Sequence, residues 1–145
     1  MKVLVDTNIL LRLSATQAPE HADVVRAVSA LLARGDEPMI AAQVLIEFWV
    51  VATRPVSVNG FGWTVVQTHA AILGFQAQFA LLEDTPAVLT RWMALVVANG
   101  VQGKRAHDAR LAATMLAHGV GTLLTLNPKD FDDFHGIAVL HPRDL

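Results

Sequence analysis

The sequence has no cysteine among its 145 residues. Disulfide bonds and zinc sites built from thiolates are therefore excluded, and a cytoplasmic location is compatible with this composition. No apolar run reaches the ~18 residues that a membrane-spanning helix needs, so no membrane contact is expected. The first residues lack the charged region, apolar stretch and cleavage site of a signal peptide, so none is expected.

The chain also has little net charge. Its formal value of −2 gives no overall basic surface of the kind that attracts nucleic acid, so a phosphate-binding surface must be local or must use metal ions. Hydrophobic residues make up 53% of the chain and its mean hydropathy is +0.42. This is enough for a substantial core and for an apolar surface that a partner covers. The length, with no repeat or linker, favours a single domain over residues 1–145.

Short apolar segments alternate with helical segments along the chain. Strands are expected at residues 3–5, 39–41, 80–82, 122–126 and 136–140. Helices are expected around residues 9–13 and at 19–34, 42–53, 63–78, 85–98 and 107–119. This alternation predicts an α/β fold with a central, mainly parallel sheet of four to five short strands and helices on both faces.

Polar oxygen ligands follow two of the expected strands. Asp6 stands directly after the first, central strand, and Asn127 and Asp130 follow the fourth. In open α/β sheets, ligands bind beyond the carboxyl ends of the strands. The same position suits Asp6, or Thr7 behind it, as the N-cap of the next helix. Asp6 taken alone fits a cap as well as it fits a functional site.

Two further carboxylates interrupt apolar helical patterns. Glu47 is followed by four apolar residues and shares a helix face with Gln43. If it is buried, it must be paired, protonated or metal-bound; otherwise it lies exposed on a narrow polar stripe. Asp108 extends the apolar face formed by Leu111 and Met115. The alternative for Asp108 is a favourable interaction with the dipole of its helix.

Several carboxylates gathered at one edge of a sheet would repel one another, and a divalent cation would relieve that repulsion. Oxygen ligands without cysteine favour Mg²⁺ or Mn²⁺ over Zn²⁺. Lys104, Arg105 and Arg110 make the start of the helix near Asp108 basic, and beside a carboxylate site they could hold phosphates. These residues predict metal-dependent phosphoryl chemistry on a polyanion.

Four segments in this order resemble the PIN-domain ribonucleases of the VapC toxin type. They are VLVDTNILL, IEFWVVATRP, GKRAHDARLAA and TLNPKDF. The resemblance implies a parallel sheet between helices, an acidic cluster that binds Mg²⁺ or Mn²⁺, and endonucleolytic cleavage of RNA, such as tRNA or rRNA, that inhibits translation and growth. It also implies a cognate antitoxin of the VapB type and a homodimer.

The resemblance assigns roles to particular residues. Asp6, Glu47 and Asp108 match the three core acids, which act in catalysis and bind metal. Asn127 stands where many members of the family carry a fourth acid, and Asp130 belongs to the same motif. Because an amide adds no charge, the site is expected to hold one cation well and a second weakly. Three further polar residues match positions that support the acids: Thr7, Asn8 and Thr125.

Two other functions compete with this one. A phosphatase with Asp6 as covalent nucleophile usually has a second Asp two residues later, where this chain has Asn8. A non-catalytic module that binds RNA or protein would not need all three core acids. Four aromatic residues suggest that part of the surface between the third and fourth helices is covered by a protein partner, although some of them must be core: Phe48, Trp49, Phe61 and Trp63.

Overall fold

Five parallel strands form the centre of the molecule. The computed structural model describes residues 1–145 and orders the strands β3-β2-β1-β4-β5. Their bounds are β1 Lys2–Val5, β2 Glu37–Ala41, β3 Ala80–Leu82, β4 Thr122–Leu124 and β5 Ala138–Leu140. Leu4 lies opposite Met39 on one side and Leu123 on the other, so β1 is the central strand. The predicted α/β fold with a parallel sheet is confirmed.

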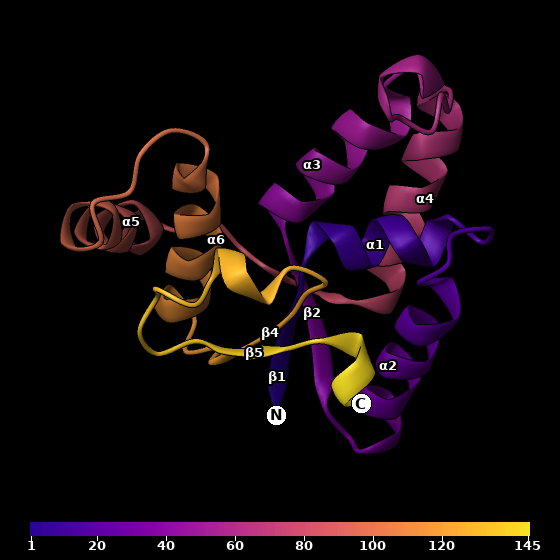
Figure 1. The fold of residues 1–145 in the computed structure, drawn as a ribbon. Helices are drawn as coiled ribbons and strands as arrows, with labels where there is room; N and C mark the ends of the chain where they lie inside the picture. The colour runs from indigo at the N-terminus through magenta and orange to yellow at the C-terminus, as the bar shows by residue number, and fades with distance from the viewer.

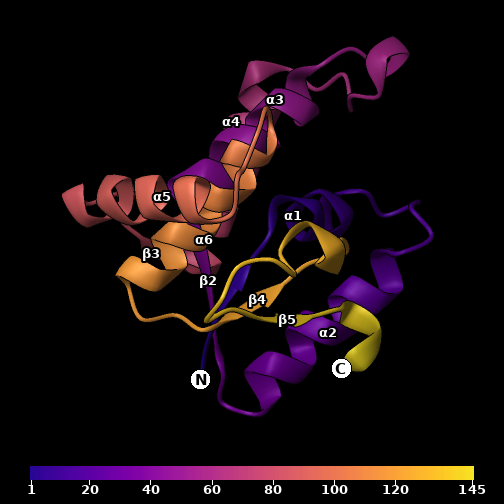
Figure 2. The ribbon, with the colours of Figure 1, turned by 60° about the vertical axis from the view of Figure 1, so that its left-hand side comes forward.

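Helices cover the sheet on both sides (Figure 1). They are α1 Thr7–Ser14, α2 His21–Ala33, α3 Ala42–Thr53, α4 Val65–Gln78, α5 Pro86–Ala98 and α6 Arg105–Ala117. Helices α1 and α2 lie on one side of the sheet, and α6 lies on the other with α5 packed outside it. Helices α3 and α4 project together beyond the sheet in both ribbon views (Figure 2). No helix is both long and apolar enough to cross a membrane.

The core forms around β1, because a central parallel strand is covered on both faces. Val3, Leu4 and Val5 are fully buried. Phe48 of α3 is also fully buried and makes edge-to-face contacts with Trp63 and Phe75 of the α4 region. These contacts secure the base of the projecting α3–α4 pair to the core.

Some element boundaries differ from those that the sequence predicts. The fourth strand ends at Leu124 rather than at residue 126. The Thr125 N–H still bonds the Leu140 carbonyl, but the Leu126 N–H bonds the Asn8 side chain instead of a strand. Helix α4 begins at Val65 rather than at residue 63, because Thr64 and Gln67 form a capping box. Helix α6 begins at Arg105, two residues earlier than expected.

The apolar face expected for the second helix is only partly core. Val24, Val28 and Leu31 of α2 are buried, whereas Val25 and Leu32 are exposed. The buried three recur at the spacing of one helix face, and the exposed two each lie one residue past a buried one. Val25 and Leu32 therefore lie on the exposed face of α2, although each directly follows a buried residue.

Truncating Phe48 tests the core directly. The Phe48→Ala variant should lower the free energy of unfolding by about 3–5 kcal/mol, because it removes a ring from a closely packed position. The Val97→Ala variant is the matched control, since Val97 is 80% exposed. Urea unfolding followed by circular dichroism measures both. A loss below about 1 kcal/mol for Phe48→Ala would contradict this packing.

Candidate active site

Asp6 is buried at the carboxyl end of β1, with 8% of its surface exposed. Its backbone N–H bonds the Leu124 carbonyl of the neighbouring strand at 3.0 Å. Its Oδ1 accepts the backbone N–H of Thr7 at 2.7 Å, so Asp6 caps α1. Its Oδ2 accepts the Thr125 hydroxyl at 2.6 Å and the Asn8 amide at 3.2 Å. Asp6 thus serves as a helix cap and lies at the sheet edge where ligands bind.

Asn8 and Thr125 join the ends of β1 and β4 around this carboxylate. The Asn8 side-chain N–H donates to the Thr125 hydroxyl at 3.1 Å, and its Oδ1 accepts the Leu126 N–H at 3.0 Å. The Thr125 oxygen also accepts the Asn127 N–H at 3.0 Å. The hydroxyl therefore uses its one donor on Asp6 and both of its lone pairs on Asn8 and Asn127. The structure brings these predicted supporting residues to Asp6.

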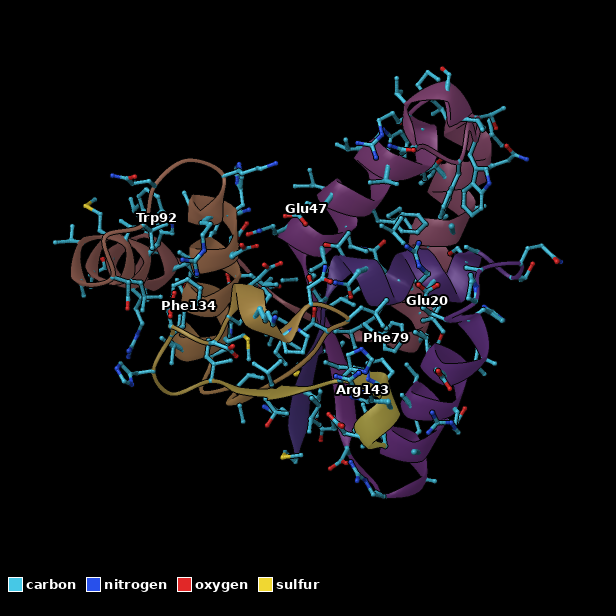
Figure 3. The ribbon with its side chains drawn as sticks, in the orientation of Figure 1. Glu20, Glu47, Phe79, Trp92, Phe134 and Arg143 are labelled. Carbon is cyan, nitrogen blue, oxygen red and sulfur yellow. The ribbon has the colours of Figure 1, made fainter.

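Glu47 lies half-buried near the middle of α3, on the side toward α6 (Figure 3). Its Oε2 accepts the Thr7 hydroxyl at 2.8 Å, which connects it to the residue beside Asp6. Its Oε1 accepts the Gln43 amide at 2.8 Å. The sequence places Gln43 on the same helix face but gives no sign that its amide also reaches the His107 carbonyl of α6, at 2.7 Å.

Asp108 lies half-buried in the first turn of α6. Burial, followed by the negative charges of Asp130, Asp6 and Glu47, raises the pKa of Asp108 to about 6, while Arg105 acts in the opposite direction. Four carboxylates thus interact across three elements and one strand end. We call Asp6, Glu47, Asp108 and Asp130 the acidic cluster.

The pKa of Asp6 is raised for similar reasons. Burial is the largest cause, the hydrogen bonds from Thr125 and Thr7 act against it, and the charges of Glu47 and Asp130 add to it. The folded chain therefore holds carboxylates where burial and mutual repulsion oppose their ionisation. Positive charge brought to this place would be stabilised.

Asp130 and Asn127 contribute differently to this charge. Asp130 ends the short 3₁₀ segment Pro128–Asp130, and its charge is the largest electrostatic influence on the pKa of Asp108. Asn127 adds no charge, and its backbone rather than its side chain bonds Thr125. Asn127 also lines a cavity with Asn8 and His141, on the side of α1 and the chain end. The electrostatics favour Asp130 as the fourth acid.

The donor set fits a hard divalent cation. Carboxylate and amide oxygens without any thiolate are the ligands that Mg²⁺ and Mn²⁺ prefer. Burial and, to a smaller extent, the neighbouring negative charges raise the pKa values of Asp6 and Asp108, and a cation bound between the acids would favour their ionised forms. As the side chains lie, no three acidic or histidine groups form a complete ligand set. Binding would therefore draw the carboxylates of the cluster closer together.

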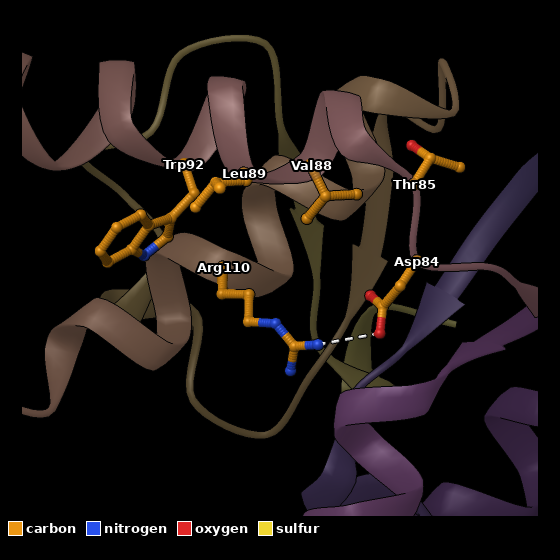
Figure 4. A pocket seen from close by; sticks show the side chains of 6 residues that line it. All are labelled: Asp84, Thr85, Val88, Leu89, Trp92 and Arg110. Carbon is orange, nitrogen blue, oxygen red and sulfur yellow. Dashed lines mark hydrogen bonds and ion pairs between the residues drawn. The ribbon is translucent and has the colours of Figure 1, made fainter.

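Two of the three predicted basic residues are engaged with other side chains. Arg105 pairs with Asp133 at 3.2 Å. Arg110 pairs with Asp84 at 3.0 Å along a cavity of about 430 Å³ between α5 and α6 (Figure 4). Lys104 is exposed at the start of α6 and forms no ion pair. Exposed ion pairs contribute little energy, so phosphate could displace Asp133 from Arg105.

The raised pKa of Asp108 makes a prediction for the metal-free protein. Because its folded pKa of about 6 lies above the ordinary 3.8, the stability from this group is complete below pH 4 and is lost as pH rises through 6. After screening by solvent, that loss amounts to about 1 kcal/mol. The stability of Asp108→Asn relative to wild type should therefore grow from pH 4 to pH 7 in urea unfolding. A difference that does not change with pH would contradict the assignment.

Comparison with known sequences identifies the family of the chain. Residues 3–136 match the PIN domain family. Ribonuclease VapC24 from Mycobacterium tuberculosis (strain CDC 1551 / Oshkosh) is 32% identical over 144 residues, which cover 95% of this chain and 94% of that protein. The range that matches the PIN domain family contains all four positions of the acidic cluster.

Several solved structures with the same fold are VapBC structures. VapBC-1 from nontypeable Haemophilus influenzae has a TM-score of 0.71 at 16% identity, covering 99% of each chain. VapBC2 from Rickettsia felis, bound to a DNA fragment from its promoter, has a TM-score of 0.70 at 17% identity, covering 97% of this chain and 98% of that one. At these identities the two structures show the fold alone. The family match and the identity to VapC24 show that the chain belongs to the PIN domain family, among proteins of the VapC type.

Proposed function

We propose that the chain is a metal-dependent endoribonuclease and the toxin of a VapBC-type pair. The observation that carries this proposal is the acidic cluster at the carboxyl end of the central strand. Thr7 bonds both Asp6 and Glu47 there, and burial together with the charges of Asp130, Asp6 and Glu47 raises the pKa of Asp108. The identity to Ribonuclease VapC24 supports RNA as the substrate, with tRNA and rRNA as the classes to test first.

Each part of the site has a role in this reaction. Asp6, Glu47 and Asp108 would hold Mg²⁺ or Mn²⁺, with Asp130 or Asn127 as the further ligand. When bound, the cation supplies an activated water and stabilises the leaving oxygen of a phosphodiester. Hydrogen bonds fix the orientation of two of the acids. Thr7 donates to Glu47, and Thr125 and Asn8 donate to Asp6. Lys104, Arg105 and Arg110 would contact the phosphates that flank the cleaved bond.

An antitoxin of the VapB type is the proposed protein partner. Several structures that share this fold are VapBC complexes. The surface offers an apolar hollow of about 340 Å³ between α3 and α4, lined by five residues: Leu45, Ile46, Trp49, Val50 and Ile72. Of the aromatic residues expected near a partner surface, Phe48 is core, whereas Trp49, Phe61 and Trp63 are half-buried. A homodimer is part of the same proposal.

The three core acids should each be essential for cleavage. Asp6→Ala, Glu47→Ala and Asp108→Ala should each lower the rate of RNA cleavage more than about 100-fold, a larger loss than outer partners of a metal cause, and should end growth inhibition. The proteins should stay folded, because losing one carboxylate relieves repulsion. Asp6→Ala also removes the cap of α1, so its melting temperature should fall below those of the other two variants. Asp23→Asn, an exposed aspartate on α2, is the control. A core-acid variant with full activity would remove that residue from the site.

Cleavage should need Mg²⁺ or Mn²⁺. EDTA should stop it and added Mg²⁺ should restore it, while the melting temperature should rise with metal because the cation binds the folded state. The measurements are a cleavage assay on purified tRNA and rRNA, and thermal unfolding with and without Mn²⁺. Full cleavage in EDTA, by protein shown to be free of other nucleases, would overturn the mechanism.

Asp130 and Asn127 can be separated by metal binding. Asp130→Asn should weaken Mn²⁺ binding more than Asn127→Ala. Of these two residues, only Asp130 carries a negative charge that acts on Asp108. Asp130→Ala should still reduce activity less than Asp6→Ala, and Asn127→Asp should strengthen binding, chiefly at a second position. Calorimetric titration with Mn²⁺ measures binding, and RNA cleavage assays measure the activity. A greater loss for Asn127→Ala than for Asp130→Asn would reverse the ranking.

A further inference from the structure

Gln43 lies on α3 and connects that helix to α6 through its side-chain amide. Its side chain is buried, with only 6% of the residue exposed, although glutamine is usually a surface residue. Both of its polar atoms have partners. The amide nitrogen donates to Glu47 Oε1 at 2.8 Å and to the His107 carbonyl at 2.7 Å, and Oε1 accepts from Arg110 at 3.4 Å. With these partners, only one orientation of the amide satisfies the contacts.

These contacts join two metal-ligand candidates from different helices. Glu47 stands one turn after Gln43 on α3, and the His107 carbonyl belongs to the residue before Asp108 on α6. One amide group therefore ties the Glu47 carboxylate to the helical turn that carries Asp108. The far side of the amide is held by Arg110, which is itself paired with Asp84 (Figure 4).

The chemistry of the amide suits a site that must receive a cation. A lysine or arginine at this place would orient Glu47 equally well, but its positive charge would compete with the metal. An amide donates hydrogen bonds without adding charge. Each oxygen of Glu47 accepts one hydrogen bond, from Gln43 or from Thr7, which leaves each oxygen a second lone pair for a ligand.

We propose that Gln43 is a positioning residue of the nuclease site, which fixes the Glu47 carboxylate relative to Asp108 before the cation binds. The proposal rests on the proposed function, because it assumes that these two acids share a metal. Outer partners of metal ligands typically change metal affinity or activity by about 10–100-fold when they are removed. The same range is expected for Gln43.

Two variants test this role. Gln43→Met keeps the length of the side chain and removes both donors. Gln43→Asn keeps the amide on a stem that is one methylene shorter, so it cannot span from Glu47 to His107. Each should weaken Mn²⁺ binding by about tenfold or more in calorimetric titrations of folded, metal-free protein. In RNA cleavage, the Mg²⁺ concentration for half-maximal rate should rise by a similar factor, and saturating Mg²⁺ should restore most of the maximal rate.

Gln76→Met, at an exposed position of α4, is the matched control and should behave as wild type. Melting temperatures of all metal-free variants separate positioning from folding. A variant at Gln43 that melts lower but binds Mn²⁺ as wild type does would show a structural role only and overturn the proposal. Wild-type affinity and Mg²⁺ dependence in both Gln43 variants would overturn it as well. If wild type itself neither binds Mn²⁺ nor cleaves RNA, the proposed function fails, and this proposal fails with it.

Discussion

Repulsion among carboxylates at the carboxyl end of β1 is the constraint on which the functional architecture depends. Asp6 is buried there, and the charges of Glu47 and Asp130 add to the effect of burial on its pKa. On α6, burial and the charges of Asp130, Asp6 and Glu47 likewise raise the pKa of Asp108. A fold that served stability alone would not gather these groups without a counter-charge. A divalent cation bound here would relieve the repulsion between the carboxylates, and that relief would favour its binding.

The surrounding hydrogen bonds hold the acids without neutralising them. Thr7, Asn8, Thr125 and Gln43 are all uncharged donors to Asp6 or Glu47. The nearby arginines form their ion pairs with other aspartates, Asp133 and Asp84. No arginine thus forms an ion pair with a side chain of the cluster, although the charge of Arg105 acts to lower the pKa of Asp108.

Much of the fold could be predicted because its signals are local. The run Val3 to Val5 is fully apolar, as a central parallel strand requires, and Asp6 follows it directly. Glu47 stood out because its helix offers few other polar positions. The exposure of Val25 and Leu32 could not be predicted, because a small rotation of α2 decides which apolar residues meet the core.

The connections across the site were beyond the reach of the sequence for a different reason. The bond from Gln43 to His107 joins residues 64 positions apart and depends on how closely α3 approaches α6. The pairing of Arg110 with Asp84 likewise depends on the placement of α6 beside the end of β3. Residue spacing could not rank Asp130 against Asn127 either, since both lie in one short turn and only the charge at Asp108 separates them.

The central claim is that Asp6, Glu47 and Asp108 hold one divalent cation between them. The most direct test is a crystal of the protein grown with Mn²⁺ and measured at the manganese absorption edge. The account predicts an anomalous peak among these three side chains, with carboxylate oxygens at roughly 2 Å, as hard divalent cations require. No peak at saturating Mn²⁺, or a peak elsewhere with the three acids still apart, would contradict it.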